Sequence, residues 1–160
     1  MKINIVMSTY NGEQFLAEQI DSIQQQTFKD WQWLIRDDGS SDQTPEIIKS
    51  FVAQDPRIVF INEHDRENFG VIKNFFTLIK HDKADYYFFS DQDDVWLEDK
   101  LETMLAAARQ YPDQLPLMVY TDLCVVDQNL QVMNQSMIRS QSHHANTEVV
   151  QELTENTVTG

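Results

Sequence analysis

Short apolar segments alternate with longer amphipathic segments along most of this chain. The apolar segments, which have the length and composition of buried β-strands, are 3–7, 31–37, 57–62, 85–90 and 117–127. The segments that repeat apolar residues at helical spacing are 12–26, 44–54, 71–80 and 97–111. Strands and helices that alternate with short connections form a mostly parallel sheet with helices on both faces. The sequence therefore predicts a Rossmann-like fold of the α/β class, with a turn at 127–130 that leads into a short hairpin partner.

Polar side chains follow each of the first four expected strands. These polar segments are 8–13, 37–42, 62–68 and 90–94. In open parallel sheets, ligands bind outside the carboxyl ends of the strands. Because these ends lie along the same edge of a sheet, we expect the four segments to form one ligand-binding rim.

Three aspartates directly follow the strand expected at 85–90. Asp91, Asp93 and Asp94 repel one another, and unpaired carboxylates are costly to desolvate. The calcium-loop template fails, because Val95 and Trp96 occupy its fifth and sixth positions. Capping of the next helix by Asp94 would explain one acid. A Mg²⁺ or Mn²⁺ ion would explain all three, because such ions take one or two carboxylates and complete their shell with phosphates and water.

Two other polar segments carry candidate binding residues. Asp37 and Asp38 end a buried strand, where a carboxylate could accept a hydrogen bond from the imide N–H of a pyrimidine or from a ribose hydroxyl. The alternative is a tight turn at Gly39. In segment 8–13, Tyr10 could flank a flat base while backbone groups supply hydrogen bonds, or the segment could be an ordinary turn before a helix.

Charge and glycine content exclude several classes of ligand site. The formal net charge is −14, which argues against nucleic acid as a partner and against passive docking on an anionic membrane surface. A phosphate ligand therefore requires local basic residues or a cation. The chain has four glycines, and none forms a Rossmann dinucleotide fingerprint or a P-loop.

Three segments in order resemble family 2 glycosyltransferases of the GT-A fold. They are VMSTYNGEQFLAEQIDSIQQQTF, IRDDGSSDQT and FFSDQDDVW, and the resemblance runs from residue 3 to about 135. Within that family they look most like bacterial rhamnosyltransferases. The resemblance implies an inverting transfer of a sugar, rhamnose, from a dTDP- or UDP-linked donor. The acceptor would be a hydroxyl of a saccharide or lipid-linked saccharide in cell-wall, capsular or O-antigen polysaccharide synthesis.

The resemblance also implies roles for individual residues. The segment that would line the nucleotide pocket contains Thr9, Tyr10, Asn11 and Glu13. Asp37 and Asp38 would include the carboxylate that reads the pyrimidine. Asp91 would face the ribose, and Asp93, together with Asp91, would bind the Mg²⁺ or Mn²⁺ that bridges the diphosphate, with Asp94 supporting them. Lys73 stands where many relatives carry Arg and would contact phosphate, and Arg66 is a weaker candidate.

The resemblance divides the chain into two parts. Residues 1–135 would form the nucleotide-sugar-binding domain, and residues 136–160 would begin a truncated acceptor-side region. The catalytic base of this family usually lies beyond the nucleotide-binding half, and neither Asp122 nor Asp127 convincingly supplies it, so we expect the base outside this chain. A cytoplasmic location is expected, at the inner face of the cell membrane through missing segments or partners.

Two alternatives stay open on sequence alone. A sugar nucleotidyltransferase also combines an α/β sheet with aspartate-bound Mg²⁺, but its first strand usually leads into a basic, glycine-rich loop, and STYNGEQF contains neither Arg nor Lys. The other alternative is a non-catalytic module in which the acids only hold a metal or a nucleotide.

Overall fold

The computed structural model describes residues 1–112 and 116–140 of the 160-residue chain. The chain divides into two compact units, Met1–Leu105 and Ala106–Gly160. Of the predicted acceptor-side region, 136–160, only residues 136–140 are described. The functional division near residue 135 therefore stays a prediction.

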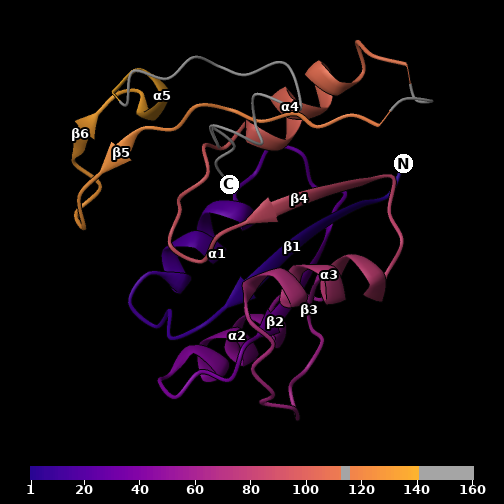
Figure 1. Cartoon of the computed structure of the whole chain (residues 1–160), viewed down its shortest axis with the longest axis vertical. Helices are drawn as coiled ribbons and strands as arrows, with labels where there is room; N and C mark the ends of the chain where they lie inside the picture. Colours follow the sequence, from indigo (N-terminus) through magenta and orange to yellow (C-terminus); the bar gives the residue numbers. More distant parts are fainter. Residues whose placement is uncertain (113–115, 141–160) are drawn as a thin grey trace. The chain divides into compact units, whose positions relative to one another are not determined.

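A four-stranded, fully parallel sheet organises the first unit (Figure 1). Its strands are β1 (Ile3–Thr9), β2 (Gln32–Asp37), β3 (Ile58–Phe60) and β4 (Tyr86–Ser90), in the order β3-β2-β1-β4. The central strand, β1, pairs with β2 on one side and with β4 on the other. This arrangement confirms the predicted α/β class, and the four apolar segments that end at residue 90 are its strands.

Helices cover both faces of the sheet, as predicted. The helices are α1 (Leu16–Gln24), α2 (Thr44–Val52), α3 (Val71–His81) and α4 (Lys100–Ala108). The larger core joins β-strand residues such as Ile5 and Ile35 to α1, α2 and the first turns of α4. The smaller core lies on the opposite face, where Val6 and Leu34 pack against Leu78 of α3. Alternate residues of each strand thus point to opposite faces, as the pleat requires.

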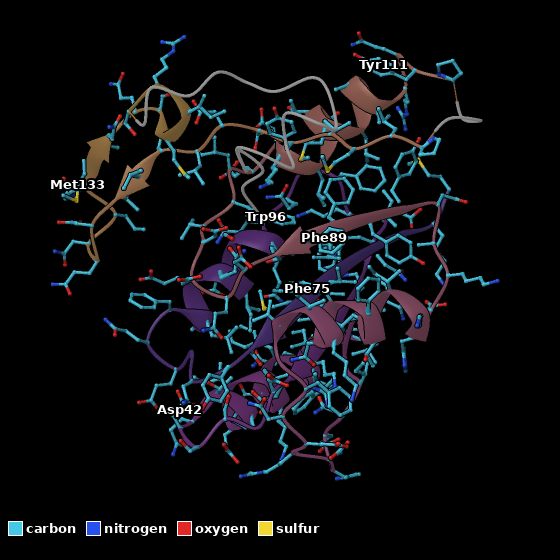
Figure 2. All side chains as sticks on the ribbon, in the orientation of Figure 1. Asp42, Phe75, Phe89, Trp96, Tyr111 and Met133 are labelled. Carbon is cyan, nitrogen blue, oxygen red and sulfur yellow. The ribbon has the colours of Figure 1, made fainter. Side chains whose placement is uncertain are left out.

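Aromatic contacts extend both cores toward the strand ends that carry the polar loops. Phe75 of α3 and Phe89 of β4 point toward one another, with ring centroids 5.3 Å apart (Figure 2). On the other face, Trp96 packs with its ring centroid 6.4 Å from that of Phe88. The backbone N–H of Trp96 also donates to the Ser22 hydroxyl of α1 at 3.0 Å. These contacts hold the chain that follows β4 against the sheet.

The predicted strand at 117–127 is wrong. Only Val125–Val126 (β5) is extended and paired, and its antiparallel partner is Val132–Asn134 (β6) in a separate two-stranded sheet. The turn and the short hairpin partner after residue 127 are confirmed. Several apolar side chains of this stretch, including Leu117 and Met118, are exposed, and none is fully buried. Apolar composition alone therefore did not distinguish a buried strand from an exposed segment.

Two aspartates hold the described part of the second unit together. The carboxylate of Asp127 accepts hydrogen bonds from the N–H groups of Asn129 and Gln131 inside the hairpin turn, at 2.8 and 2.9 Å. The carboxylate of Asp122 accepts from the Ser136 hydroxyl and from the N–H of Ile138, at the start of α5 (Met137–Ser140). In the described ranges, no helix combines the length and apolar character that crossing a membrane requires.

A charged cluster connects the end of α1 to the start of β3. The guanidinium of Arg57 donates to both carboxylate oxygens of Asp55, at 3.0 and 2.7 Å, and stacks 3.7 Å from the Trp31 ring centroid. Gln24 adds a third donor at 3.1 Å. The hydrogen bonds from Arg57, opposed by burial, lower the pKa of Asp55 from 3.8 to about 2.

Asp55→Asn is expected to reduce the free energy of unfolding by about 1 kcal/mol at pH 7, because it removes the charge from this cluster. Since the folded-state pKa lies below 3.8, this stabilisation is present above about pH 4 and is lost as pH falls toward 2. Urea unfolding at pH 7, 5 and 3 should show the difference between the proteins shrinking at the lowest pH. Asp21→Asn removes an exposed acid and serves as the control. An equal difference at all three pH values would contradict this account.

Candidate active site

The predicted rim forms where the strand order changes direction. From β1 the chain proceeds to β2 and β3 on one side, whereas β4 lies on the other side of β1. Thr9, the last residue of β1, pairs in register with Asp37, the last residue of β2. The loops after β1, β2 and β4 therefore emerge at one edge, next to a topological switch point, which is where open α/β sheets bind ligands.

Asp37 is buried and engaged by its own loop. Its carboxylate accepts hydrogen bonds from the Thr9 hydroxyl at 2.9 Å and from the N–H groups of Gly39 and Ser40 at 3.1 and 2.8 Å. The Ser40 hydroxyl donates as well. Gly39 has a φ of 83°, so the tight turn proposed at this position is present. The structure thus brings two predicted site residues, Thr9 and Asp37, into direct contact, and both are buried.

Asp38 belongs to a buried ion pair that sequence reasoning missed. Arg36, which is 2% exposed, donates to Asp38 at 3.2 Å and also bonds the side chain of Asn74 in α3. The Asp38 carboxylate accepts from the N–H groups of Phe69 and Gly70 at 2.6 and 2.9 Å. The sequence signal for this ion pair was a positively charged residue, Arg36, near the end of an otherwise apolar strand and directly before two acids. This pair fixes the loop that leads into α3.

The backbone of segment 10–13 is bonded to side chains from other loops. Its four consecutive N–H groups donate to acceptors at 2.8–3.1 Å, which in order are Gln92 Oε1, Ser40 Oγ, Thr44 Oγ1 and Asp42 Oδ2. In return, Asn11 and Glu13 accept from the N–H groups of Ser41 and Gln43, both at 2.9 Å. The loops after β1 and β2 are therefore interlocked before any ligand binds. The backbone donors expected for a ligand are used by the protein itself.

Tyr10 is the aromatic residue of the predicted pocket, and like Asn11 and Glu13 it is exposed to solvent. Its side chain is exposed, although its backbone is held on both sides by Gln92. An aromatic ring on an anchored backbone suits stacking on a flat base, because little conformational freedom is lost on binding. Gln92 was not predicted, and its position between two aspartates was the only signal in the sequence.

The acids after β4 influence one another electrostatically. Partial burial, followed by the negative charge of Asp93, raises the pKa of Asp91. Burial, followed by the charges of Asp91 and Asp93, raises the pKa of Asp94, while Lys100 opposes both shifts. The Lys100 ammonium lies 4.7 Å from the Trp96 ring centroid. Since α4 begins at Lys100, Asp94 does not cap it, and the capping alternative is wrong.

These acids fit a cation that takes few protein ligands. Within the described residues, no three acidic, histidine or cysteine side chains converge on a common point. Asp91 and Asp93 nevertheless offer hard oxygen donors whose mutual repulsion a divalent cation would relieve. Mg²⁺ and similar ions need only one or two such carboxylates when substrate phosphates are present. The donor set therefore suits a metal bound together with a diphosphate, and it does not suit a closed structural metal site.

Lys73 lies on the first turn of α3, beside the loop that Asp38 holds. Its ammonium is 3.7 Å from the centroid of the Phe69 ring, and the Arg36 guanidinium lies 3.8 Å from the same centroid. Lys73 also lines an open groove of about 730 Å³ with Phe69, Gly70, Val71, Ile72, Phe76 and Lys80. No ion pair joins Lys73 to an acid in the part of the chain that the structure describes. Arg66 contributes its backbone carbonyl, which packs against Gly39.

Comparison with known proteins decides the family. The family model for glycosyl transferase family 2 matches residues 4–150. This chain belongs to glycosyl transferase family 2. The predicted family is therefore confirmed, and the match favours a glycosyltransferase over a nucleotidyltransferase.

Curated relatives of this family 2 chain are longer than it is. The dTDP-rhamnosyl transferase RfbG of Shigella flexneri is 40% identical over 102 residues, which cover 62% of this chain and 35% of that protein. The UDP-Glc:alpha-D-GlcNAc-diphosphoundecaprenol beta-1,3-glucosyltransferase WfgD of Escherichia coli is 27% identical over 136 residues, or 85% of this chain and 48% of that protein. The chain thus spans about a third and about half of their lengths.

Solved structures with the same fold support the GT-A assignment. TarS of S. aureus in complex with UDP-GlcNAc superposes with a TM-score of 0.61 at 24% identity, covering 69% of this chain and 32% of that chain. The mannosyltransferase PcManGT of Pyrobaculum calidifontis, in complex with GDP-Man and Mn²⁺, superposes with a TM-score of 0.58 at 20% identity, covering 65% and 31%. At these identities the likeness shows the fold alone.

Asp38→Ala is expected to lower the free energy of unfolding of this family 2 chain by about 3 kcal/mol, because Arg36 would stay buried without its carboxylate. Asp38→Asn keeps a hydrogen-bond acceptor and should cost less. Urea denaturation at pH 7 measures both, with Asp30→Ala, an exposed acid, as the control. A loss no larger than that of the control would show that the ion pair does not hold the loop.

Proposed function

We propose that this chain is the nucleotide-sugar-binding part of an inverting glycosyltransferase. It would move a sugar from a nucleoside-diphosphate donor to a hydroxyl of a saccharide or lipid-linked saccharide during polysaccharide synthesis. One observation carries the proposal. The loops after β1 and β2 are hydrogen-bonded to each other, and the loop after β1 is also bonded to the acidic segment after β4, at the switch point of a family 2 chain.

The β1 and β2 loops would bind the nucleoside. In this proposal the exposed ring of Tyr10 stacks on the pyrimidine, while Thr9, Asn11 and Glu13 hold the loop in place through the bonds described above. Asp37 and Asp38 act on the base mainly by fixing the surrounding backbone. A direct hydrogen bond from the imide N–H would go to Asp38 Oδ2, which accepts one hydrogen bond, from the N–H of Gly70, whereas each oxygen of Asp37 already accepts two.

Asp91 and Asp93 would bind the rest of the donor. Asp91 faces the ribose, and both carboxylates hold a Mg²⁺ or Mn²⁺ ion, which would stabilise the negative charge that develops on the departing diphosphate. Their repulsion in the free protein supports this role, because a cation would remove it. Lys73 supplies a further positive charge near the loop of Asp38, where a phosphate could approach it.

The sugar and the acceptor are proposed by analogy with relatives. RfbG, by its name a dTDP-rhamnosyl transferase, is 40% identical to this chain over the shared region, which favours dTDP-rhamnose as the donor over a UDP-linked sugar. WfgD acts, by its name, on a diphosphoundecaprenol-linked sugar, which favours a lipid-linked acceptor. A cytoplasmic location at the inner face of the membrane stays a prediction.

The general base that would deprotonate the acceptor hydroxyl is proposed to lie outside this chain. The hydrogen bond from Ser136 is the main reason why the pKa of Asp122 is lowered, and backbone N–H groups in the hairpin turn lower the pKa of Asp127. Both carboxylates thus stabilise the second unit. We therefore expect the chain on its own to bind donor without transferring the sugar.

Nucleotide binding should depend on a divalent metal and on Asp93. Calorimetry of the 160-residue chain with dTDP and with UDP is expected to show tighter binding when Mn²⁺ is present. Asp93→Asn should weaken binding in Mn²⁺ about 30-fold, because a charge-assisted contact is worth about 2 kcal/mol. Asp99→Asn, which removes a nearby exposed acid, should have little effect. Binding that is insensitive to both Mn²⁺ and Asp93→Asn would refute the proposed function.

A further inference from the structure

The carboxamide of Gln92 forms a two-way hydrogen bond with the backbone of Tyr10. Gln92 Oε1 accepts from the N–H of Tyr10 at 2.8 Å, and Gln92 Nε2 donates to the carbonyl of Tyr10 at 3.0 Å. A side-chain amide thus pairs with a main-chain residue much as a neighbouring strand would. The pair connects two loops that are 82 residues apart in sequence and lie on opposite sides of the switch point.

Gly12 makes room for this pair. A Cβ atom at position 12 would lie 2.5 Å from Gln92 Oε1, 2.7 Å from Cδ and 3.1 Å from Nε2, and these are the three atoms nearest to it. The backbone around Gly12 is itself fixed, because its N–H donates to Thr44 Oγ1 at 2.8 Å. A side chain at position 12 would therefore displace Gln92 from Tyr10. The need for glycine here comes from the close approach of Gln92.

Gln92 also stands between the two proposed metal ligands. Its neighbours in sequence are Asp91 and Asp93, so holding its side chain against Tyr10 limits where the backbone of both acids can move. A nucleotide bound to the Tyr10 loop and a cation bound to the acids would meet at the diphosphate. Two loops that are already at a fixed separation bind such a bridging ligand at a lower entropic cost.

We propose that Gln92 is a positioning residue that couples cation binding at Asp91 and Asp93 to nucleotide binding at the Tyr10 loop. This inference rests on the proposed function and deepens it. Loss of the contact between Gln92 and Tyr10 leaves the side chains of the Tyr10 loop and of the two aspartates in place. It reduces the factor by which the metal increases nucleotide affinity, and this factor measures the coupling between the two sites.

The coupling is tested by the ratio of two dissociation constants. The Kd of dTDP and of UDP is measured without and with Mn²⁺ for the unaltered 160-residue chain, Gln92→Ala, Gly12→Ala and the double variant. The ratio is the Kd without Mn²⁺ divided by the Kd with Mn²⁺. The ratio is expected to fall about five-fold in Gln92→Ala, the size of effect that loss of one or two exposed hydrogen bonds produces. Gly12→Ala should lower it similarly, and the double variant should show no further loss. Gln54→Ala removes a glutamine that follows α2 and donates to the carbonyl of Ser50, and it is the matched control.

Thermal unfolding supplies a readout that needs no ligand. Gly12→Ala should lower the Tm of the unaltered chain but should have almost no effect in the Gln92→Ala background, where the atoms that it would strike are absent. A contact that only stabilises the fold would lower the Tm and leave the ratio of dissociation constants unchanged.

The outcomes separate this inference from the proposed function. A ratio that is unchanged in Gln92→Ala, in a chain that binds nucleotide more tightly with Mn²⁺, would overturn the coupling and leave the proposed function intact. Absence of metal-dependent nucleotide binding in the unaltered chain would overturn both. Additive effects of Gly12→Ala and Gln92→Ala on the Tm would overturn the contact between the two residues as the basis of the coupling.

Discussion

The position of β1 in the middle of a parallel sheet is the constraint on which the rest of this structure depends. Because the chain places β2 and β3 on one side of β1 and β4 on the other, the loops after residues 9, 37 and 90 emerge at one edge. These loops are far apart in the sequence and meet only in the folded chain. Their polar groups must therefore satisfy one another across the edge or bind a ligand, and the backbone of residues 10–13 is satisfied by side chains of the other loops.

The acids at this edge divide into two groups according to burial. Asp37 and Asp38 are buried and accept hydrogen bonds from backbone N–H groups of the loops, and Asp38 also pairs with Arg36. Asp91 and Asp93 instead repel each other, and their charges are the ones that a ligand could use. The first pair fixes the shape of the loops after β2 and before α3, and the second pair would hold the metal in the proposed function. A rigid frame of this kind costs little to reorganise on binding.

The sequence predicted the elements of this fold better than it predicted the contacts between them. Periodicity located the four strands of the sheet, because buried parallel strands are apolar on both faces. It failed at 117–127, where the apolar side chains are exposed or only partly buried and only Val125–Val126 is paired. The aspartates could be identified from the sequence as candidate site residues. No local sequence feature shows, however, that the backbone N–H groups of Phe69 and Gly70 donate hydrogen bonds to the Asp38 carboxylate. The fit of Gln92 against Gly12 depends on two segments that meet only in the folded chain.

The central claim is that the loops after β1 and β4 form one metal-dependent nucleotide site, and paramagnetic NMR tests it most directly. Mn²⁺ broadens the signals of nearby amide protons, so the isotope-labelled chain would be titrated with Mn²⁺ in the presence of dTDP. The account predicts that the amide signals of residues 9–13 and 91–94 disappear first, while those at the opposite ends of the same strands, residues 2–4 and 85–87, persist longest. First losses at residues 2–4 and 85–87, or uniform broadening over the many acidic residues of the chain, would contradict it.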